Sequence, residues 1–322
     1  MDAITVTDDG RLELVDTPDP VPGAGEVLVD VVAAGVNRAD LLQVRGGHQP
    51  PEGESDVLGL ECSGTISVLG DHVEGWQVGD RVCALLAGGG YGTKAVLPVG
   101  QLLRVPDSVD LVDAAALPES VCTAWTNMVE QGHLAPSQTV LVHGGSGGVG
   151  TIAIQLAHTY GSRVVTTAGG PERTARCIEL GADVAVDHRS DDVADQILGA
   201  TDGRGVDVVL DVLGAGGLEL NISVLAERGR IMVIGVLDGA TGPIDLGALL
   251  ARSGTISALK LRTRSRASKA ALIDDVRERV WPWVADGRVV PVIAERIPLA
   301  EAGRAHEVMA AGGAFGKILL TV

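Results

Sequence analysis

A short glycine-rich loop, Gly145-Ser-Gly-Gly-Val-Gly150, limits most strongly what this chain can fold into. It directly follows an apolar run, Thr139 to His143, and it opens a helix-like stretch from Val149 to Tyr160. In such a strand-loop-helix unit the first glycine, Gly145, permits a tight turn, the second lets the backbone approach a bound group, and the last lets helix and strand pack closely. The N–H groups at a helix N-terminus attract anions. The loop therefore predicts a binding site for the diphosphate of a dinucleotide.

Alternation of apolar runs and helix-like stretches continues after the loop. It predicts a doubly wound parallel sheet, the Rossmann architecture of the α/β class. Helices are expected from Glu172 to Leu180, opened by Pro171, and from Asp191 to Leu198. The expected strands are Thr139 to His143, Arg163 to Thr167, Asp183 to Asp187, Val206 to Asp211, Arg230 to Ile234 and Thr255 to Ala258.

The two ends of the chain do not follow this alternation of strands and helices. Before the alternation, short β-like runs such as Glu26 to Ala34 are separated by Gly, Pro and Asp. After Lys260 the sequence predicts one long polar helix from Ser268 to Val284, a helix from about Ala300 to Ala311 and an apolar strand from Gly316 to Val322. An apolar final strand needs a β neighbour, so the tail is expected to return to the first domain. The predicted domains are a mainly β catalytic domain over 1–121, a nucleotide-binding domain over 122–258 and a returning segment over 259–322.

Charge and cysteine usage narrow the functional class. The formal net charge of −17 opposes binding to a phosphate backbone, so nucleic acid is not an expected partner. No apolar run is long enough to cross a bilayer and no signal-peptide pattern opens the chain, which predicts a soluble, cytoplasmic protein. The four cysteines, Cys62, Cys83, Cys122 and Cys177, lack metal-site spacing and are expected to be reduced and mostly buried.

The end of the second expected strand, Thr167-Ala-Gly-Gly170, bears on the choice of nicotinamide cofactor. NAD enzymes usually carry an Asp or Glu there, about twenty residues after the glycine loop, that binds the ribose 2′-hydroxyl. No carboxylate stands there to repel a 2′-phosphate, and Arg173 and Arg189 lie close in sequence, so NADPH is expected. Glu172 leaves NAD open, although an acid in a first helical turn is also explained by the helix dipole.

Several motifs together resemble one enzyme family. They are the glycine loop, Val-Gly-Asp-Arg-Val82, Ala114-Ala-Ala-Leu-Pro-Glu-Ser with Thr123-Ala-Trp125, and Asn37-Arg-Ala-Asp-Leu41. The combination resembles the medium-chain dehydrogenase/reductases, in particular the quinone oxidoreductase branch that includes zeta-crystallin. The likeness extends down to Gly316-Lys-Ile-Leu-Leu320 and so covers nearly the whole chain. It implies a GroES-like β barrel as the first, catalytic domain.

The zinc ligands of that superfamily are missing here. Zinc members carry Gly-His-Glu where this sequence has Gly59-Leu60-Glu61, and a ligand cysteine in the segment that reads Asn37-Arg-Ala-Asp40 here. Catalytic zinc needs about three protein ligands, so no metal is expected, and Glu61 is expected to pack or to form hydrogen bonds. Hydrogen-bond donors must then polarise the substrate carbonyl, which suits quinones and conjugated enones.

The resemblance also implies the site residues. Asn37, Asp40 and His48 are the expected catalytic residues, with His48 standing where related reductases have a tyrosine. Each also has a plain structural explanation, as a turn cap, a helix-start acid and a solvated loop histidine. The residues expected to contact NADPH are Thr123, Gly145, Ser146, Gly147, Gly148, Val149, Gly150, Gly170, Arg173, His188, Leu213, Gly235, Arg262 and Lys317. For the last two, a solvated basic loop and a solvated surface charge are the alternatives.

These observations predict an NADPH-dependent quinone oxidoreductase that transfers hydride without zinc, the nicotinamide facing a cleft between the domains. Reduction of an enone double bond by NADPH is the alternative, and the sequence does not separate the two. A zinc alcohol dehydrogenase is less favoured because the zinc ligands are missing. A non-catalytic nucleotide- or RNA-binding protein is less favoured because the chain is acidic and lacks interleaved aromatic residues. A small-molecule substrate is also expected. The resemblance further implies a homodimer, for which an unpaired edge strand near Thr255 to Leu261 is the candidate interface.

Overall fold

The computed structural model describes residues 1–7 and 9–322, and these separate into two compact units. Unit 1 contains Met1–Cys122 and Leu261–Val322, and unit 2 contains Thr123–Lys260.

Unit 2 is built on a 6-stranded sheet in the order β10-β9-β8-β11-β12-β13. All neighbouring strands in it run parallel. This is the strand order of a Rossmann fold, so the predicted doubly wound sheet is confirmed. The strands are β8 (Thr139–Val142), β9 (Arg163–Ala168), β10 (Val184–Asp187), β11 (Val206–Asp211), β12 (Leu225–Val233) and β13 (Thr255–Ala258).

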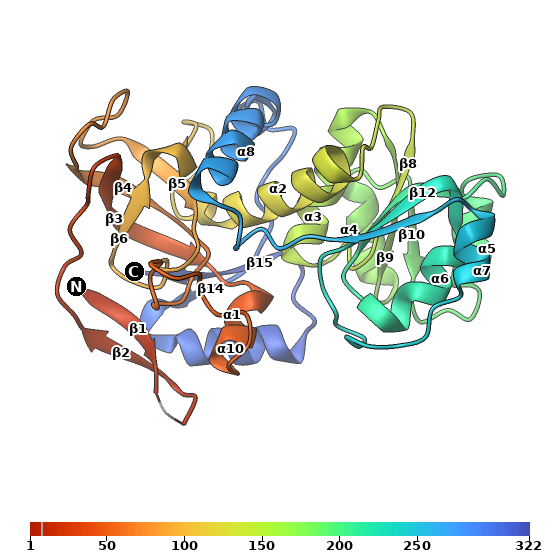
Figure 1. Ribbon diagram of the computed structural model, residues 1–322, viewed down its shortest axis with the longest axis horizontal. Helices are drawn as coiled ribbons and strands as arrows, with labels where there is room; N and C mark the ends of the chain where they lie inside the picture. Colours follow the sequence, from red (N-terminus) through yellow and green to blue (C-terminus); the bar gives the residue numbers. More distant parts are fainter. Residues whose placement is uncertain (8) are drawn as a thin grey trace. The chain divides into compact units, whose positions relative to one another are not determined.

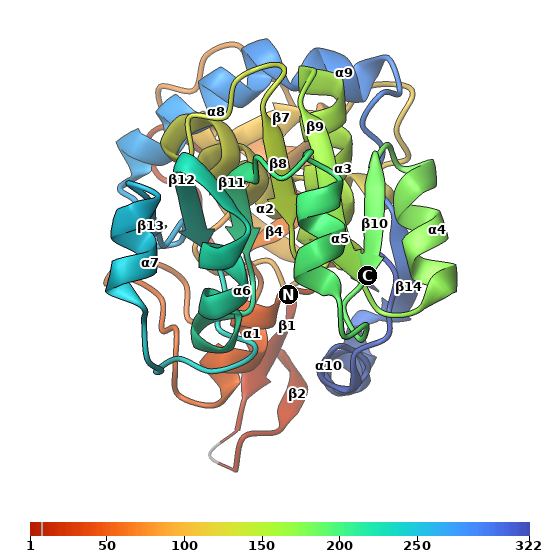
Figure 2. The same ribbon diagram turned by 90° about the vertical axis from the view of Figure 1, so that its right-hand side faces the viewer.

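Helices cover both faces of this sheet because each connection between parallel strands must cross over it. The helices are α3 (Gly148–Tyr160), α4 (Pro171–Glu179), α5 (Val193–Gly199), α6 (Leu218–Ser223) and α7 (Leu246–Ala251). Side chains of α5, α6 and α7 pack with Leu141, Val165 and Val209 in one hydrophobic cluster. Figure 2 shows α5 and α6 in front of the strands. The carboxyl ends of β8 and β11, where the strand order reverses, are thereby left for a ligand.

One expected strand of unit 2 differs from the sequence prediction. β12 begins at Leu225, earlier than the predicted Arg230, and its pairing with β11 shifts register between Val206 and Val208. Arg228 within it has a φ of +60°, which marks an irregular turn inside the strand.

Unit 1 is mainly β, as expected for a GroES-like domain. Its 7-stranded sheet has the order β14-β15-β3-β4-β5-β7, β6 also pairs with β3, and β1 and β2 form a separate pair. Its strands are β1 (Asp2–Val6), β2 (Leu12–Asp16), β3 (Glu26–Gly35), β4 (Glu61–Leu69), β5 (Arg81–Leu85), β6 (Lys94–Pro98), β7 (Leu102–Arg104), β14 (Ile293–Pro298) and β15 (Lys317–Thr321).

The last strand pairs with a strand near the start of the chain. β15 runs antiparallel to β3, with Leu319 opposite Gly35 and Leu320 opposite Ala34. Leu320 and Ile318 pack into the main hydrophobic cluster of unit 1. This pairing brings Lys317, at the first position of β15, to the end of β3, where the candidate site begins.

The helices of unit 1 are α1 (Arg38–Val44), α2 (Pro118–Trp125), which runs on into unit 2, α8 (Arg266–Arg279), α9 (Trp281–Ala285) and α10 (Ala302–Ala311). Figure 1 shows α10 beside α1, with which it is in contact. The single long helix predicted from Ser268 to Val284 is wrong, because the chain breaks after Arg279 and restarts as α9 at Trp281. Pro282 explains the break, since its ring has no N–H and clashes with the preceding helical turn.

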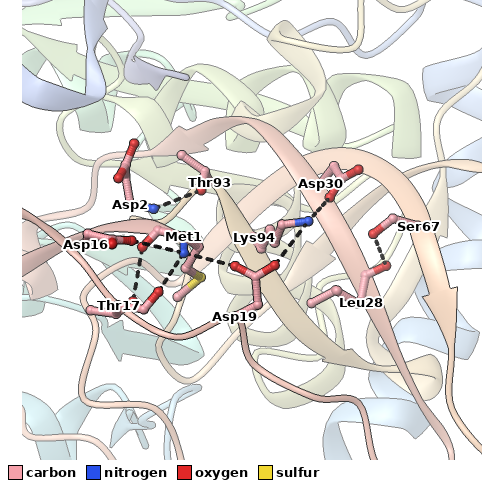
Figure 3. A network of polar contacts seen from close by, with 10 residues as sticks. All are labelled: Met1, Asp2, Asp16, Thr17, Asp19, Leu28, Asp30, Ser67, Thr93 and Lys94. Atoms are coloured by element: carbon pink, nitrogen blue, oxygen red, sulfur yellow. Dashed lines mark hydrogen bonds and ion pairs between the residues drawn. The ribbon is translucent and has the colours of Figure 1, made fainter.

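A polar network ties the first strands of unit 1 to its sheet (Figure 3). The Lys94 ammonium lies 3.0 Å from Asp30 and 3.6 Å from Asp19, and Asp19 also contacts the Met1 amino group at 2.9 Å. These groups are partly exposed, so solvent screens the ion pairs and each contributes little to stability.

The predicted state of the cysteines is confirmed, because all four are buried and free of disulfides. None of the helices in the described ranges is both long enough and apolar enough to cross a bilayer.

The antiparallel pairing of β3 and β4 requires a glycine at position 64, and this generates a first prediction. A Cβ added at Gly64 would lie 2.1 Å from the Asp30 carbonyl oxygen, so Gly64→Ala must push the paired strands apart. We expect the free energy of unfolding to fall by roughly 1–3 kcal/mol. Gly303→Ala in α10 is the matched control, since nothing lies within 4 Å of its added Cβ, and it should leave stability unchanged or raise it. Equal effects of the two substitutions in urea denaturation would contradict this account.

Candidate functional site

The glycine loop of unit 2 folds into a close turn between β8 and α3. Gly147 is the N-cap of α3 and donates its N–H to the Gly144 carbonyl oxygen at 2.9 Å. A Cβ at Gly150 would lie 2.2 Å from that same oxygen, so only glycine fits there. The first N–H groups of α3 have no carbonyl of an earlier helical turn to bond, as a site for a diphosphate requires.

The turn closed by the Gly144 carbonyl and the Gly147 N–H has Gly145 as a central residue, and a further glycine, Gly144, precedes it. Gly144 has the left-handed φ of +69°, whereas Gly145 does not. Gly145 is needed for space, because a Cβ there would lie 2.1 Å from Thr166 Oγ1. Gly145 thus lies in the turn as predicted, and glycine is required there for space rather than for a left-handed φ.

A buried histidine that the sequence analysis missed stabilises the loop through Thr167. His143 directly follows β8 and is fully buried, with Nδ1 3.0 Å from Thr167 Oγ1 and Nε2 2.7 Å from Asn221 Oδ1. The Thr167 carbonyl oxygen accepts the Gly145 N–H at 2.9 Å. Burial lowers the pKa of His143, although the hydrogen bond to Asn221 opposes this shift. A polar residue ending an apolar strand was the only sequence signal.

Basic side chains lie over the end of β9. A Cβ at Gly169 would lie 2.8 Å from Arg189 Nη2 and 3.2 Å from His188 Cε1, so both side chains face the Gly169–Gly170 turn. Gly170 has a φ of +84° and caps α4, on which the half-buried Arg173 lies. The predicted residues Gly170 and His188 are thus brought together, with Arg189 beside them.

A carboxylate that the sequence analysis did not consider lies close to the same turn. Asp187 ends the neighbouring strand β10, and hydrogen bonds from the Gly170 and Arg189 backbones lower its pKa. Its oxygens are therefore already engaged by this turn. Asp187 belongs to β10, so the residue pattern at the end of β9 does not indicate it.

The remaining predicted contacts of unit 2 follow β11 and β12. Asp211, fully buried, accepts the N–H groups of Leu213 and Gly214, each at 3.0 Å. A Cβ at Gly235 would lie 3.0 Å from the Val212 carbonyl oxygen. A mostly apolar hollow of about 360 Å³ lies nearby, lined by residues that include Gly214, Ala215, Val236, Thr241 and Ile256. Thr123, at the start of unit 2, is half-buried and accepts a hydrogen bond from Asn127 on its carbonyl.

In unit 1, a buried ion pair joins β15, the last strand, to β4. Lys317 Nζ lies 2.5 Å from Glu61 Oε1 and donates to Asn37 Oδ1 at 2.7 Å. Asn37 Nδ2 in turn donates to Glu61 Oε1 at 3.0 Å. The second carboxylate oxygen of Glu61 accepts the Glu119 N–H at 2.9 Å. Lys317 is therefore a buried, paired cation rather than the solvated charge considered as an alternative, and Glu61 forms hydrogen bonds as expected.

A second chain of polar side chains starts at Asp40, in the first turn of α1. Asp40 Oδ2 accepts the Asn37 backbone N–H at 2.8 Å and the Tyr91 hydroxyl at 3.0 Å. Tyr91 also lies 3.3 Å from His306 Nε2. Burial raises the pKa of Asp40 to about 6, against the effect of these two hydrogen bonds and of Lys317. Burial lowers the pKa of His306 to about 4.

The structure brings Asn37, Asp40 and Lys317 together and adds Tyr91 and His306, which the sequence analysis missed. His48 is half-exposed, with a φ of +49°, and its carbonyl oxygen accepts a hydrogen bond from Arg262 Nη1. Arg262 Nε donates to the Ala87 carbonyl at 2.6 Å. Arg262 is thus buried in unit 1, and a solvated basic loop is the wrong description of its surroundings.

Potential metal ligands do not gather in the described ranges, 1–7 and 9–322. These residues contain no group of three or more His, Cys, Asp or Glu side chains that could hold a metal ion. At Glu61, the Lys317 ammonium bonds the carboxylate.

Two family models match the chain, one in each part of the fold. An alcohol dehydrogenase GroES-like domain matches residues 23–107, and a zinc-binding dehydrogenase domain matches residues 148–278.

Individual proteins are similar in sequence to this chain over nearly its whole length. One polypeptide of the phenolphthiocerol/phthiocerol polyketide synthase of Mycobacterium tuberculosis is 35% identical over 97% of this chain, which spans only 14% of that relative's length. The Sus scrofa quinone oxidoreductase is 29% identical, with 99% of this chain and 97% of the relative covered.

Solved structures agree with these matches. A mycobacterial quinone oxidoreductase has a TM-score of 0.83 and 31% identity, with 100% of both chains covered. An Escherichia coli quinone oxidoreductase complexed with NADPH has a TM-score of 0.86 and 25% identity, covering 100% of this chain and 99% of that one. The two matched domains, the strand order and these full-length similarities together show that the chain belongs to the medium-chain dehydrogenase/reductase superfamily of oxidoreductases, in its quinone oxidoreductase-like branch.

Proposed function

We propose that this chain is an NADPH-dependent quinone oxidoreductase that works without zinc. The observation that carries the proposal is the glycine cradle between β8 and α3, in a chain that matches quinone oxidoreductases along their whole length. The cradle fits a dinucleotide because the close approach of Gly150 to the Gly144 carbonyl leaves the start of α3 open to a diphosphate.

Different residues of unit 2 bind the diphosphate and the 2′-phosphate of the cofactor. Backbone N–H groups from Ser146 to Val149 bind the diphosphate, and His143 keeps this loop in place through Thr167. Arg189, His188 and Arg173 supply cationic or hydrogen-bonding groups for a 2′-phosphate beside Gly170. The Escherichia coli neighbour that binds NADPH supports this assignment. When bound, NADPH supplies a hydride from its nicotinamide ring.

The residues of unit 1 supply hydrogen bonds and a proton. The buried Asp40 carboxyl, with its pKa raised to about 6, holds a proton near neutral pH more readily than an exposed aspartate does. We propose that Asn37 and Asp40 act on the substrate and that Lys317 keeps the Asn37 side chain in place. His48, from the following loop, is proposed to flank the substrate.

The second candidate is reduction of the carbon–carbon double bond of an enone. The polyketide synthase relative favours it, because that match has the higher identity, 35% against 29% for the Sus scrofa quinone oxidoreductase. Both reactions place hydride on a conjugated acceptor and need the same cofactor and a proton.

The cofactor assignment predicts a selective effect of Arg189. Arg189→Ala removes a charge-assisted hydrogen bond to a 2′-phosphate, so the Kd for NADPH should rise roughly 10- to 100-fold while that for NADH changes little. Isothermal titration calorimetry on the full chain measures both values. Arg163→Ala, at the opposite end of β9, is the control and should change neither. Equal weakening of NADPH and NADH by Arg189→Ala would contradict the assignment.

The substrate assignment predicts a ratio of rates. With NADPH as reductant, kcat/KM for 9,10-phenanthrenequinone should exceed that for any of a panel of enones by roughly tenfold. The opposite ratio would select the second candidate, and absence of NADPH oxidation with either class would reject both. Gly150→Ala, which closes the cradle, provides the matched background rate.

Zinc independence predicts that chelation has no effect. Dialysis of the purified protein against EDTA should leave quinone reduction within about twofold of its starting rate, since no step requires a bound metal. Metal analysis by mass spectrometry accompanies the assay. Loss of about one zinc per chain together with activity would overturn this part of the proposal.

A further inference from the structure

Three buried side chains of unit 1 form a continuous hydrogen-bonded chain that leads outward from α1. Tyr91 OH lies 3.0 Å from Asp40 Oδ2 and 3.3 Å from His306 Nε2. Asp40 and Tyr91 are completely buried, whereas His306, on α10, keeps 9% of its surface exposed. In the described part of the chain, Tyr91 is the one hydrogen-bond partner of the His306 ring, which leaves Nδ1 available to water.

The protonation state of Asp40 fixes the direction of every hydrogen bond in this chain. When Asp40 is ionised it can only accept, so the Tyr91 hydroxyl donates to it. The Tyr91 oxygen then accepts from His306, whose proton must be on Nε2, and Nδ1 carries a lone pair. When Asp40 is protonated on Oδ2, it donates to Tyr91, Tyr91 donates to Nε2, and the His306 proton must be on Nδ1.

One proton converts the first arrangement into the second. A proton from water binds His306 Nδ1, the Nε2 proton moves to the Tyr91 oxygen, and the original Tyr91 proton moves to Asp40 Oδ2. No electrons are exchanged, each bond broken is replaced by one formed, and Tyr91 ends as a neutral phenol. The net result is one proton delivered to Asp40 and a change of His306 tautomer.

We propose that Asp40, Tyr91 and His306 form a proton relay that carries protons from solvent at α10 to the buried carboxyl on α1. Its use in reloading Asp40 after each turnover rests on the proposed function, because hydride transfer to a quinone or enone must be completed by a proton. Asp40 Oδ1 is buried without a hydrogen-bond partner, so this side of the carboxyl is free for a substrate. Rotation of the protonated carboxyl about its Cβ–Cγ bond brings the proton from the Tyr91 side to this side. Tyr91 and His306 position and move this proton and need not touch the substrate.

The surroundings of the relay allow Asp40 to change its protonation state near neutral pH. Asp40 interacts electrostatically with Lys317, Glu61 and Arg262, which oppose one another in sign. Burial dominates and raises the pKa of Asp40 to about 6, so both charge states are populated near neutral pH. With its pKa lowered to about 4, His306 stays neutral in the same range and changes only its tautomer.

The tautomer of His306 provides a test that does not depend on activity. We would label the histidines of the full chain with ¹⁵N, assign His306 from a His306→Gln variant, and follow its Nδ1 and Nε2 shifts from pH 8 to pH 5. The relay predicts a proton on Nε2 at pH 8 and on Nδ1 at pH 5, with a midpoint near pH 6. A single tautomer throughout, or an imidazolium within this range, would overturn the proposal.

Two variants separate the relay from a general pH effect. Asp40→Asn removes the titrating group and should hold His306 in one tautomer at all pH values, and Tyr91→Phe should uncouple the tautomer from Asp40. Persistence of the wild-type switch in either variant would overturn the relay. If Tyr91→Phe fails to fold, Asp40→Asn alone decides.

Kinetics then test the use of the relay. With NADPH and 9,10-phenanthrenequinone, Tyr91→Phe and His306→Asn should each lower kcat roughly tenfold or more at pH 8, with a smaller loss at pH 5, and leave KM within about twofold. Tyr160→Phe, which lies against Trp125 in unit 2, is the control and should change neither. A tautomer switch in a wild-type protein that reduces no quinone would reject the proposed function alone. An active wild-type protein without the switch would reject the relay alone.

Discussion

The buried ion pair between Lys317 and Glu61 is the interaction on which the arrangement of unit 1 depends. Both side chains are almost wholly out of water, and removing one partner of such a pair typically costs about 3–5 kcal/mol, because the other charge is left uncompensated. The pair forms because β15 adds to β3 and carries Lys317 to the start of α1. Asn37, which bonds both members of the pair, is held in place by it. The position of α1, and with it Asp40, follows.

The main constraint in unit 2 is the close approach of backbone atoms at the glycine loop. Glycine at 145 and 150 lets β8, the turn and α3 approach within distances that a Cβ would prevent, and glycine at 144 adopts a left-handed φ. Such a loop has few side chains of its own to stabilise it. Thr167 therefore stabilises it by accepting the Gly145 N–H, and His143 in turn contacts the Thr167 hydroxyl. A neutral imidazole suits this position, because burial opposes the charged form.

The two units therefore supply complementary chemistry. Unit 2 presents backbone N–H groups and arginines, which bind phosphate but hold no transferable proton near neutral pH. Unit 1 presents a buried carboxyl, a phenol and an imidazole connected in one chain. A reduction that adds a hydride and a proton needs both kinds of group.

The sequence by itself determined the features that arise from neighbouring residues. The glycine loop and the βα alternation are local patterns, so the Rossmann sheet and the glycine cradle between β8 and α3 could be predicted. Some local features could not be predicted, such as the positive φ at Gly144 and the break before Pro282, because space and backbone geometry decided them. Only the tertiary structure could join Lys317 to Asn37, 280 residues apart, and His306 to Tyr91, 215 residues apart. Burial then paired Lys317 with Glu61 and raised the pKa of Asp40, since desolvation exists only once distant strands and helices have packed around these groups.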